Sequence, residues 1–218
     1  MKVDSDSFAN ARLSRILRVE ARREFRLGAD DDQFPRLQSG WAAELIVLHD
    51  GRRQVTGLFL PGERVISSPL ARDGEASTLL AITPLELHLE EPRSHASELE
   101  ALRVEISAHL SNAFRSLVRL GCLTAYEKTA NMLLEIAERT GATQGETIEF
   151  PLTQELMADM LGLSQVHVNR TLQQLRRDGL IELQGGRLSI LRPEGLLTAG
   201  QYRALFRPRP GAGAQAGE

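Results

Sequence analysis

The stretch from residue 152 to residue 191, LTQELMADMLGLSQVHVNRTLQQLRRDGLIELQGGRLSIL, constrains the fold more than any other part of the chain. Thr153 and Ser164 are of the residue types that cap helix N-termini, and Gly162 lies where the chain must turn between them. Apolar residues recur at helical spacing as far as Gly179, a typical residue just beyond a helix end. The stretch therefore predicts two short helices joined by a tight turn.

Two short alternating segments follow the second predicted helix. Ile181 and Leu183 alternate with polar residues, Gly185-Gly186 supplies a two-residue turn, and a second alternating segment returns. This pattern predicts a β-hairpin. A helix, a turn, a second helix and a hairpin, in this order, are typical of a winged helix-turn-helix, which places its second helix in the major groove of DNA.

The face of the second predicted helix opposite its apolar stripe is mostly polar. Arginine can bind guanine O6 and N7, asparagine or glutamine can pair with adenine, and valine can contact a thymine methyl group. Ser164 and His167 at the helix start suit phosphate contacts. A solvated face is the alternative for an isolated helix, but the flanking helix and hairpin favour DNA. The predicted DNA-binding residues are Ser164, Gln165, Val166, His167, Asn169, Arg170 and Gln173.

Residues 94–121 predict a long amphipathic helix that ends at Gly121. The apolar stripe is formed by residues spaced three or four apart: Leu99, Leu102, Ile106, Leu110, Ala113, Leu117 and Leu120. Such a stripe packs either on its own domain or on the same helix of a second copy. A second helix is expected over residues 125–140 and a strand over residues 148–150, leading to the winged helix-turn-helix.

The N-terminal part predicts one helix and then a sheet. Residues 7–26 are expected to be helical, with Leu13, Ile16 and Leu17 on one side. Asp50-Gly51 is a turn signal between two alternating segments. Short strands are expected at 41–48, 53–60, 78–82 and 85–89. This spacing is typical of a β-roll or jelly roll.

The chain resembles the Crp/Fnr superfamily of bacterial transcription regulators. The matching motifs are LTQELMADMLGLS, VNRTLQQLRRDGLI and GRLSIL, and, earlier, SGWAAELIVLHDGRRQVTGLFLPGE at residues 39–63. The resemblance implies an α+β fold with a jelly-roll-like, cyclic-nucleotide-binding-domain-like sensory β-roll and a dimerisation helix. The expected domains are the sensory β-roll with its N-terminal helix at 1–93, the dimerisation helix at 94–122, the winged helix-turn-helix at 123–206 and a disordered tail at 207–218.

The resemblance also implies partners and base contacts. Double-stranded DNA and a second copy of the chain are the expected partners, RNA polymerase is a candidate, and no effector is assigned. Base contacts fall on Gln165, Val166 and Arg170, with Asn169 nearby. The family often has glutamate where Val166 stands, and valine cannot accept a hydrogen bond from cytosine N4. The operator is therefore expected to differ from the best-known family operators.

Cyclic-nucleotide binding is not expected. Relatives that bind such a ligand carry an arginine followed by serine or threonine after the Gly-Glu pair, and this arginine neutralises the phosphate. Here Gly62-Glu63 is followed by RVISSPLARDGEAST, in which Asp73 follows Arg72. The sequence therefore predicts a regulator that does not depend on a cyclic nucleotide, with no cofactor assigned.

Composition excludes several other classes. The 218-residue chain is 42% hydrophobic, which supports a folded core, and its net charge of −3 is not typical of a non-specific nucleic-acid binder. Arginines nevertheless gather in the winged helix-turn-helix region. No apolar run is long enough to span a membrane, no secretory leader is evident, and a cytoplasmic protein is expected. Cys122, the single cysteine, cannot form an iron–sulfur site alone and is expected to be a plain buried residue. A thiol sensor or a disulfide between two subunits at Cys122 is the alternative.

No metal site or enzyme is predicted, because the five histidines lack metal-site spacing and no nucleotide-binding or hydrolase motif is present. The remaining alternative is a ligand-sensing adaptor whose helix-turn-helix binds a protein. Steep salt dependence of DNA binding, with a large gap between specific and random DNA, would favour the regulator over the adaptor.

Overall fold

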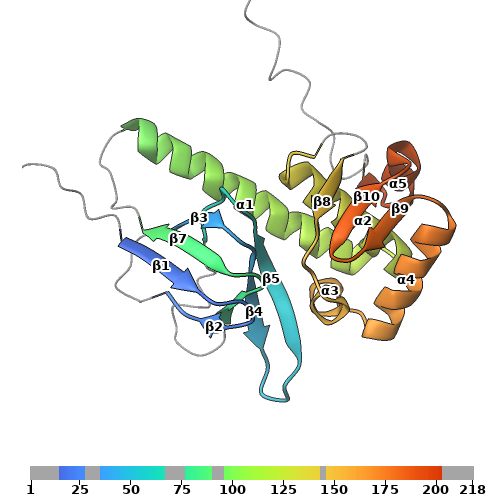
Figure 1. The fold of residues 1–218 in the computed structure, drawn as a ribbon, viewed down its shortest axis with the longest axis horizontal. Helices are drawn as coiled ribbons and strands as arrows, with labels where there is room; N and C mark the ends of the chain where they lie inside the picture. Colours follow the sequence, from blue (N-terminus) through green and yellow to red (C-terminus); the bar gives the residue numbers. More distant parts are fainter. Residues whose placement is uncertain (1–14, 28–34, 67–76, 90–95, 143–145, 203–218) are drawn as a thin grey trace, which may run out of the picture. The chain divides into compact units, whose positions relative to one another are not determined.

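The computed structural model describes residues 15–27, 35–66, 77–89, 96–142 and 146–202 (Figure 1). The chain forms two compact units: Met1–Asp50 with Thr56–His109, and Gly51–Val55 with Leu110–Glu218. Residues 67–76, which include Arg72 and Asp73, lie outside the described residues, as does the expected disordered tail at 207–218.

Two antiparallel sheets make up the first unit. One has the order β1-β7-β3, with β1 at Arg15–Val19, β7 at Leu85–Leu89 and β3 at Arg36–Ser39. The other has the order β2-β6-β4-β5, with β2 at Glu24–Phe25, β6 at Ser77–Ala81, β4 at Ala42–Val47 and β5 at Arg53–Phe59. The four strands predicted from alternation are confirmed to within one residue at each end.

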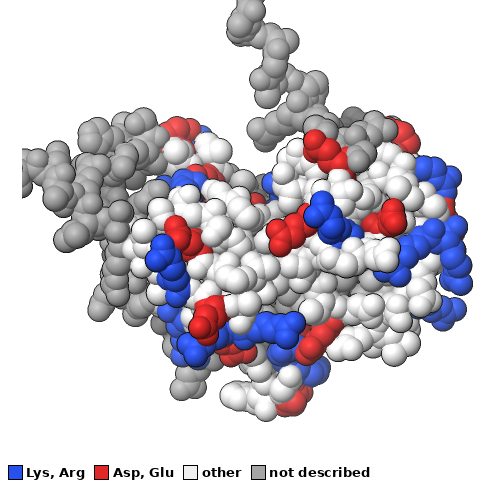
Figure 2. Space-filling view, viewed as in Figure 1, with Lys and Arg blue, Asp and Glu red and all other residues white. Residues whose placement is uncertain are grey.

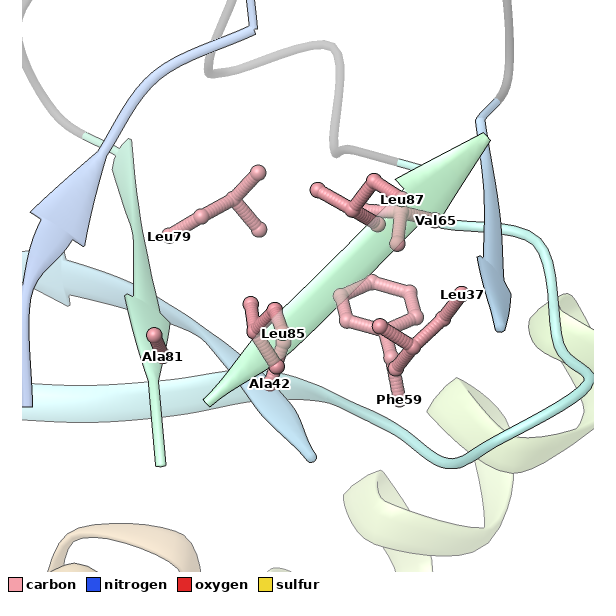
Figure 3. Close-up of a cluster of buried hydrophobic side chains, with 8 residues drawn as sticks. All are labelled: Leu37, Ala42, Phe59, Val65, Leu79, Ala81, Leu85 and Leu87. Atoms are coloured by element: carbon pink, nitrogen blue, oxygen red, sulfur yellow. The ribbon is translucent and has the colours of Figure 1, made fainter. Parts of the chain in front are cut away.

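The core of this unit lies between the two sheets (Figure 3). Along β7, Leu85, Leu87 and Leu89 are buried and alternate with half-buried residues, which is the period-two pattern of a strand with one face on a core. Both sheets supply side chains to the cluster: Leu37, Ala42, Phe59, Val65, Leu79, Ala81, Leu85 and Leu87. Burial of these side chains from both sheets is the main force that holds the sheets together.

The predicted N-terminal helix is wrong where the structure describes it. Residues 15–19 form β1, which pairs antiparallel with β7 from Val19 opposite Leu85 to Arg15 opposite Leu89. Leu17 and Val19, two residues apart, pack on the core, whereas Ile16 is 45% exposed. The spacing of Leu13, Ile16 and Leu17 suited a helix, but pairing with a strand far along the chain decided the local structure. Residues 7–14 lie outside the described part.

The long helix α1 spans Ala96–Cys122 and confirms the amphipathic helix. Its expected end at Gly121 is confirmed to within one residue, because the helix ends at Cys122, but the φ angle of Gly121 is not positive, so this glycine does not end the helix in the left-handed conformation. The chain instead ends α1 just before Thr124, whose side chain caps the next helix. A strong cap for the following helix, rather than a terminal glycine, therefore sets this boundary.

The second unit contains the C-terminal part of α1 and a winged helix-turn-helix. Helix α2 spans Ala125–Arg139, and Thr124 and Glu127 form a capping box at its start. The sheet has the order β8-β10-β9. The remaining elements are β8 at Thr147–Glu149, α3 at Gln154–Leu161, α4 at Gln165–Arg177, β9 at Ile181–Gln184, β10 at Arg187–Ile190 and α5 at Pro193–Ala199.

Candidate DNA interface

The helix-turn-helix is held by the local signals that its sequence contains. The Thr153 hydroxyl accepts a hydrogen bond from the backbone N–H of Leu156 at 3.1 Å and so caps α3. Gly162 ends α3 in the left-handed conformation, with φ +61°. The Ser164 hydroxyl then accepts from the backbone N–H of His167 and caps α4. The two predicted caps and the glycine turn are confirmed.

Helix α4 is fastened to α2 along its buried face. Val168, Leu172 and Leu175 are fully buried, as the predicted stripe requires. Between them, the hydroxyl of Thr171 lies 3.0 Å from that of Thr129 on α2, a buried hydrogen bond between the two helices. Because this polar contact is directional and shielded from water, it fixes the rotation of α4 about its own axis.

A second polar contact holds the C-terminal end of α4. The Tyr126 hydroxyl on α2 donates to the Asp178 carboxylate at 2.6 Å. Burial, together with this carboxylate, raises the pKa of Tyr126 to about 12, so the phenol stays protonated and keeps donating at physiological pH. Gly179 follows with φ +65°, and the backbone N–H of Leu180 donates to the Leu175 carbonyl. The predicted glycine helix end is confirmed.

The opposite face of α4 presents the predicted DNA-binding residues. Val166 is 75% exposed, and Val166, Arg170 and Gln173 share one face because they lie four and three residues apart. Asn169 is half-buried and accepts a hydrogen bond from Gln173 at 3.4 Å. The exposed members of the predicted set are Ser164, Gln165, Val166, His167, Arg170 and Gln173.

Two of these residues interact with each other at the start of α4. The Ser164 hydroxyl lies 3.0 Å from Nδ1 of His167, besides its capping bond to the His167 backbone. The exposed end of the helix therefore combines a positive helix dipole, backbone N–H groups and an ordered hydroxyl–imidazole pair. This arrangement suits an anionic oxygen such as that of a DNA phosphate.

The wing extends the basic surface beyond α4. Gly185 and Gly186 have φ angles of +58° and +73°, which is the geometry of the two-residue turn that the sequence predicts. The guanidinium of Arg176 donates to the carbonyl of Leu183 at 3.0 Å and ties the end of α4 to the wing. Arg187 is exposed directly after the turn. Figure 2 shows basic side chains gathered at the edge of the molecule where Figure 1 draws α4.

The apolar stripe of α1 faces outward. Leu99, Leu110 and Leu117 are 59%, 52% and 66% exposed, and Ile106 is 40% exposed. Ala113 is exposed as well, whereas Leu102 and Leu120 are half-buried. Large apolar side chains on a helix are normally covered, so this face is suited to a partner.

Sequence reasoning missed two residues of this apolar face. Val104 is 55% exposed and Phe114 is 59% exposed. Phe114 lies four residues after Leu110 and three before Leu117, so the helical spacing could have identified it. Ala113, which the sequence assigns to the stripe, is exposed beside Phe114.

Charged side chains of α1 form contacts within each unit. In the first unit, Glu105 forms ion pairs with Arg36 at 2.9 Å and Arg64 at 2.6 Å. In the second unit, the Arg119 side chain is buried and donates to Asn131 at 3.0 Å and to Glu135. Charged groups of α1 thus form contacts within the chain, while three leucines of its apolar stripe, Leu99, Leu110 and Leu117, are more than half exposed.

The remaining predictions about sites concern cysteine, metals and membranes. Cys122 is exposed, so the expectation of a buried cysteine is wrong; the residue lies at the last turn of α1 rather than in a core. Within the described residues, no group of three or more His, Cys, Asp or Glu side chains is placed to hold a metal ion. Among the helices in the described ranges, none combines the length and apolar character needed to cross a membrane.

A double-sheet N-terminal unit, a long helix with an exposed apolar face and a winged helix-turn-helix define the class of the protein. Residues 127–199 match the model of the Crp-like helix-turn-helix domain. FixK2 from Bradyrhizobium japonicum has a similar solved structure, with a TM-score of 0.72 over 86% of this chain and 97% of that one, at 22% identity. This likeness shows the shared fold.

Curated relatives agree with the fold. The chain is 35% identical over 160 residues to the transcriptional activator protein FnrL of Cereibacter sphaeroides, covering 68% of this chain and 64% of the relative. It is 33% identical over 157 residues to the nitrogen fixation regulation protein FixK of Bradyrhizobium diazoefficiens, covering 67% and 65%. The chain belongs to the Crp/Fnr family of transcription regulators. The matches span slightly less than two thirds of the length of these two relatives.

Proposed function

We propose that the chain is a sequence-specific DNA-binding transcription regulator that reads a two-fold-symmetric operator as a homodimer. The observation that carries the proposal is the exposed face of α4, with Gln165, Val166 and Arg170, on a helix held by the Thr129–Thr171 and Tyr126–Asp178 contacts. Base readout needs side chains at fixed positions, and these contacts supply the fixed positions.

The homodimer is proposed because of the two faces of α1. One recognition helix reads only a few base pairs, whereas two helices on a two-fold axis read two half-sites about one helical turn apart. The exposed face of α1 carries large apolar side chains, and its inward face is already satisfied by ion pairs. A parallel pairing of two copies would cover the apolar face without breaking any of these contacts.

We also propose three functional parts: a sensory β-roll at residues 1–93, a dimerisation helix at 94–122 and a DNA-binding winged helix-turn-helix at 123–206. RNA polymerase is a candidate partner, and no catalytic step is proposed.

We infer that the regulator works without a cyclic nucleotide, because the expected arginine is missing from the sequence after Gly62-Glu63. In addition, the Glu63 carboxylate already accepts the backbone N–H of Leu60 at 2.9 Å.

The test begins with selection of binding sites from random DNA by the purified full chain. Arg170→Ala is then expected to weaken binding to the selected operator by about 1–3 kcal/mol per half-site and to relax specificity at one base pair of each. Arg18→Ala, which removes another exposed arginine, on β1, is the control and is expected to leave binding unchanged.

The salt dependence separates the proposal from the protein-binding adaptor. A regulator is expected to lose affinity steeply with added salt, while keeping a large gap between the selected operator and random DNA. Failure to select any sequence, or equal binding of the Arg170 variant and the unaltered chain at fixed salt, would refute the assignment of α4 as the reading helix.

A further inference from the structure

The second unit carries an apolar groove that the DNA interface does not use. It has a volume of about 240 Å³ and lies among α2, β8, β10 and α5. Within the described residues its lining comes from these elements and their flanks, and neither α3 nor α4 contributes to it. The apolar part of the lining includes Leu134, Ile148, Leu188, Ile190, Leu197 and Tyr202.

The chain leaves the described structure at the rim of this groove. After α5, Gln201 turns the chain with a positive φ angle of +51°. Tyr202 is then buried against the groove, and its hydroxyl donates to the Glu138 carboxylate on α2. Residues 203 onward therefore start next to the groove, and any apolar side chain among the first few of them has a short path into it.

The sequence after Tyr202 supplies a fitting apolar pair. Residues 203–206 read Arg-Ala-Leu-Phe, and the following residues, RPRPGAGAQAGE, contain no other large apolar side chain. An extended chain advances at most about 3.3–3.6 Å per residue, so the three or four residues that end at Leu205 or Phe206 can reach no further than about 10–14 Å from Tyr202. Sites that bury drug-sized ligands have volumes of roughly 300–1,000 Å³. The groove is smaller than these sites, and its volume suits one or two side chains better.

Charge complementarity also favours residues 203–206 as the occupant of the groove. The carboxylates of Glu138 and Glu146 lie in its lining, and the segment that follows Tyr202 carries Arg203 and Arg207 on either side of the apolar pair. A tethered segment also acts at an effective concentration in the millimolar range, so weak contacts are enough to hold it.

We propose that residues 203–206 fold back on the winged helix-turn-helix of their own chain and seat Leu205 and Phe206 in this groove. The contact covers apolar surface contributed by α2, β10 and α5 and so fastens the C-terminal helix to the rest of the unit. The proposal is independent of DNA recognition, because the groove and the exposed face of α4 share no lining residue.

The experiment compares the methyl NMR signals of Leu134, Ile148, Ile190 and Leu197 in the full chain and in a chain that ends at Tyr202. The four signals are expected to shift on truncation, and backbone amides of β8 and α5 are expected to exchange about tenfold faster. The double variant Leu205→Ser/Phe206→Ser should reproduce the truncated spectrum. A chain that ends at Pro210 is the matched control and should give the spectrum of the full chain.

Two results would overturn the proposal. One is agreement of the groove signals among the full chain, the double variant and the chain that ends at Tyr202. The other is a shift of the isotope-labelled short chain towards the full-chain spectrum when unlabelled full chain is added, since the segment would then belong to a second copy. Operator binding by the short chain is expected to be unchanged, so that failure of this inference stays distinct from failure of the DNA proposal.

Discussion

Replacement of Leu117 by alanine tests the role of α1 most directly. Leu117 is 66% exposed in the isolated chain, and complete burial of a leucine side chain contributes about 1.5–3 kcal/mol. Covering the exposed two thirds in a dimer therefore contributes about 1–2 kcal/mol per subunit, of which alanine keeps a small part. Because the two-fold axis doubles the change, the dimer should lose about 2–3 kcal/mol, a rise of about 30- to 150-fold in its dissociation constant.

The assay is sedimentation equilibrium of the full chain over a wide concentration range. Leu191→Ala is the matched control, since Leu191 is 53% exposed but lies between β10 and α5. The control should leave the dissociation constant unchanged, and the monomer of the Leu117 variant should unfold at the same denaturant concentration as the unaltered monomer. An unchanged dissociation constant for Leu117→Ala, or an equal rise for both variants, would refute the assignment of this face to dimerisation.

Three further predictions concern other parts of the chain. Gly40→Ala should destabilise the first unit by at least about 2 kcal/mol in denaturant unfolding, because φ is +87° and the new Cβ would lie 2.1 Å from the carbonyl oxygen of Pro84. Gly51→Ala is the control: its φ is similar, +83°, but the new Cβ would meet open space, so the substitution should cost only about 1 kcal/mol. Hydrogen bonds in the capping box hold the pKa of Glu127 below its ordinary value, so its stabilisation is complete above that value and disappears as the pH falls through the lowered pKa. Glu127→Gln should therefore reduce stability at pH 7, and the difference from the unaltered chain should shrink as the pH is lowered through the acidic range. Val166→Glu, at a 75% exposed position, should shift the selected operator towards cytosine at one position per half-site without changing the unfolding midpoint.

The winged helix-turn-helix was predictable because its boundaries are set by nearby residues. Thr153 and Ser164 cap helices within three residues of themselves, and Gly162 and Gly179 end helices through their own φ angles. Each of these signals acts through local hydrogen bonds or backbone sterics, so the sequence contains it directly.

The N-terminal segment and the two faces of α1 were not predictable in the same way. Strand β1 is defined by its pairing with β7, and Leu17 shows its period-two role only once this partner is known. Similarly, the periodicity of α1 identified an apolar stripe but not the direction it faces. That direction follows from Glu105, whose partners Arg36 and Arg64 come from the sheet unit. Contacts between distant residues therefore decided what local patterns left open.

Buried contacts between α1 and α2 limit the ways in which a signal could control DNA binding. Arg119, on α1, bonds Asn131 and Glu135 on α2, and Asn131 also donates to the carbonyl of Gly200 at 2.8 Å. Removing one member of a buried charged network leaves the other unpaired at a cost of several kcal/mol, so this junction resists bending. These bonds fasten the C-terminal part of α1 to α2, and the Thr129–Thr171 contact joins α2 to the reading helix. In the proposed homodimer, the pairing of two α1 helices would therefore set the distance between two α4 helices. A signal that controls DNA binding must then favour one arrangement of the paired α1 helices over another, because it gains nothing from binding both arrangements equally.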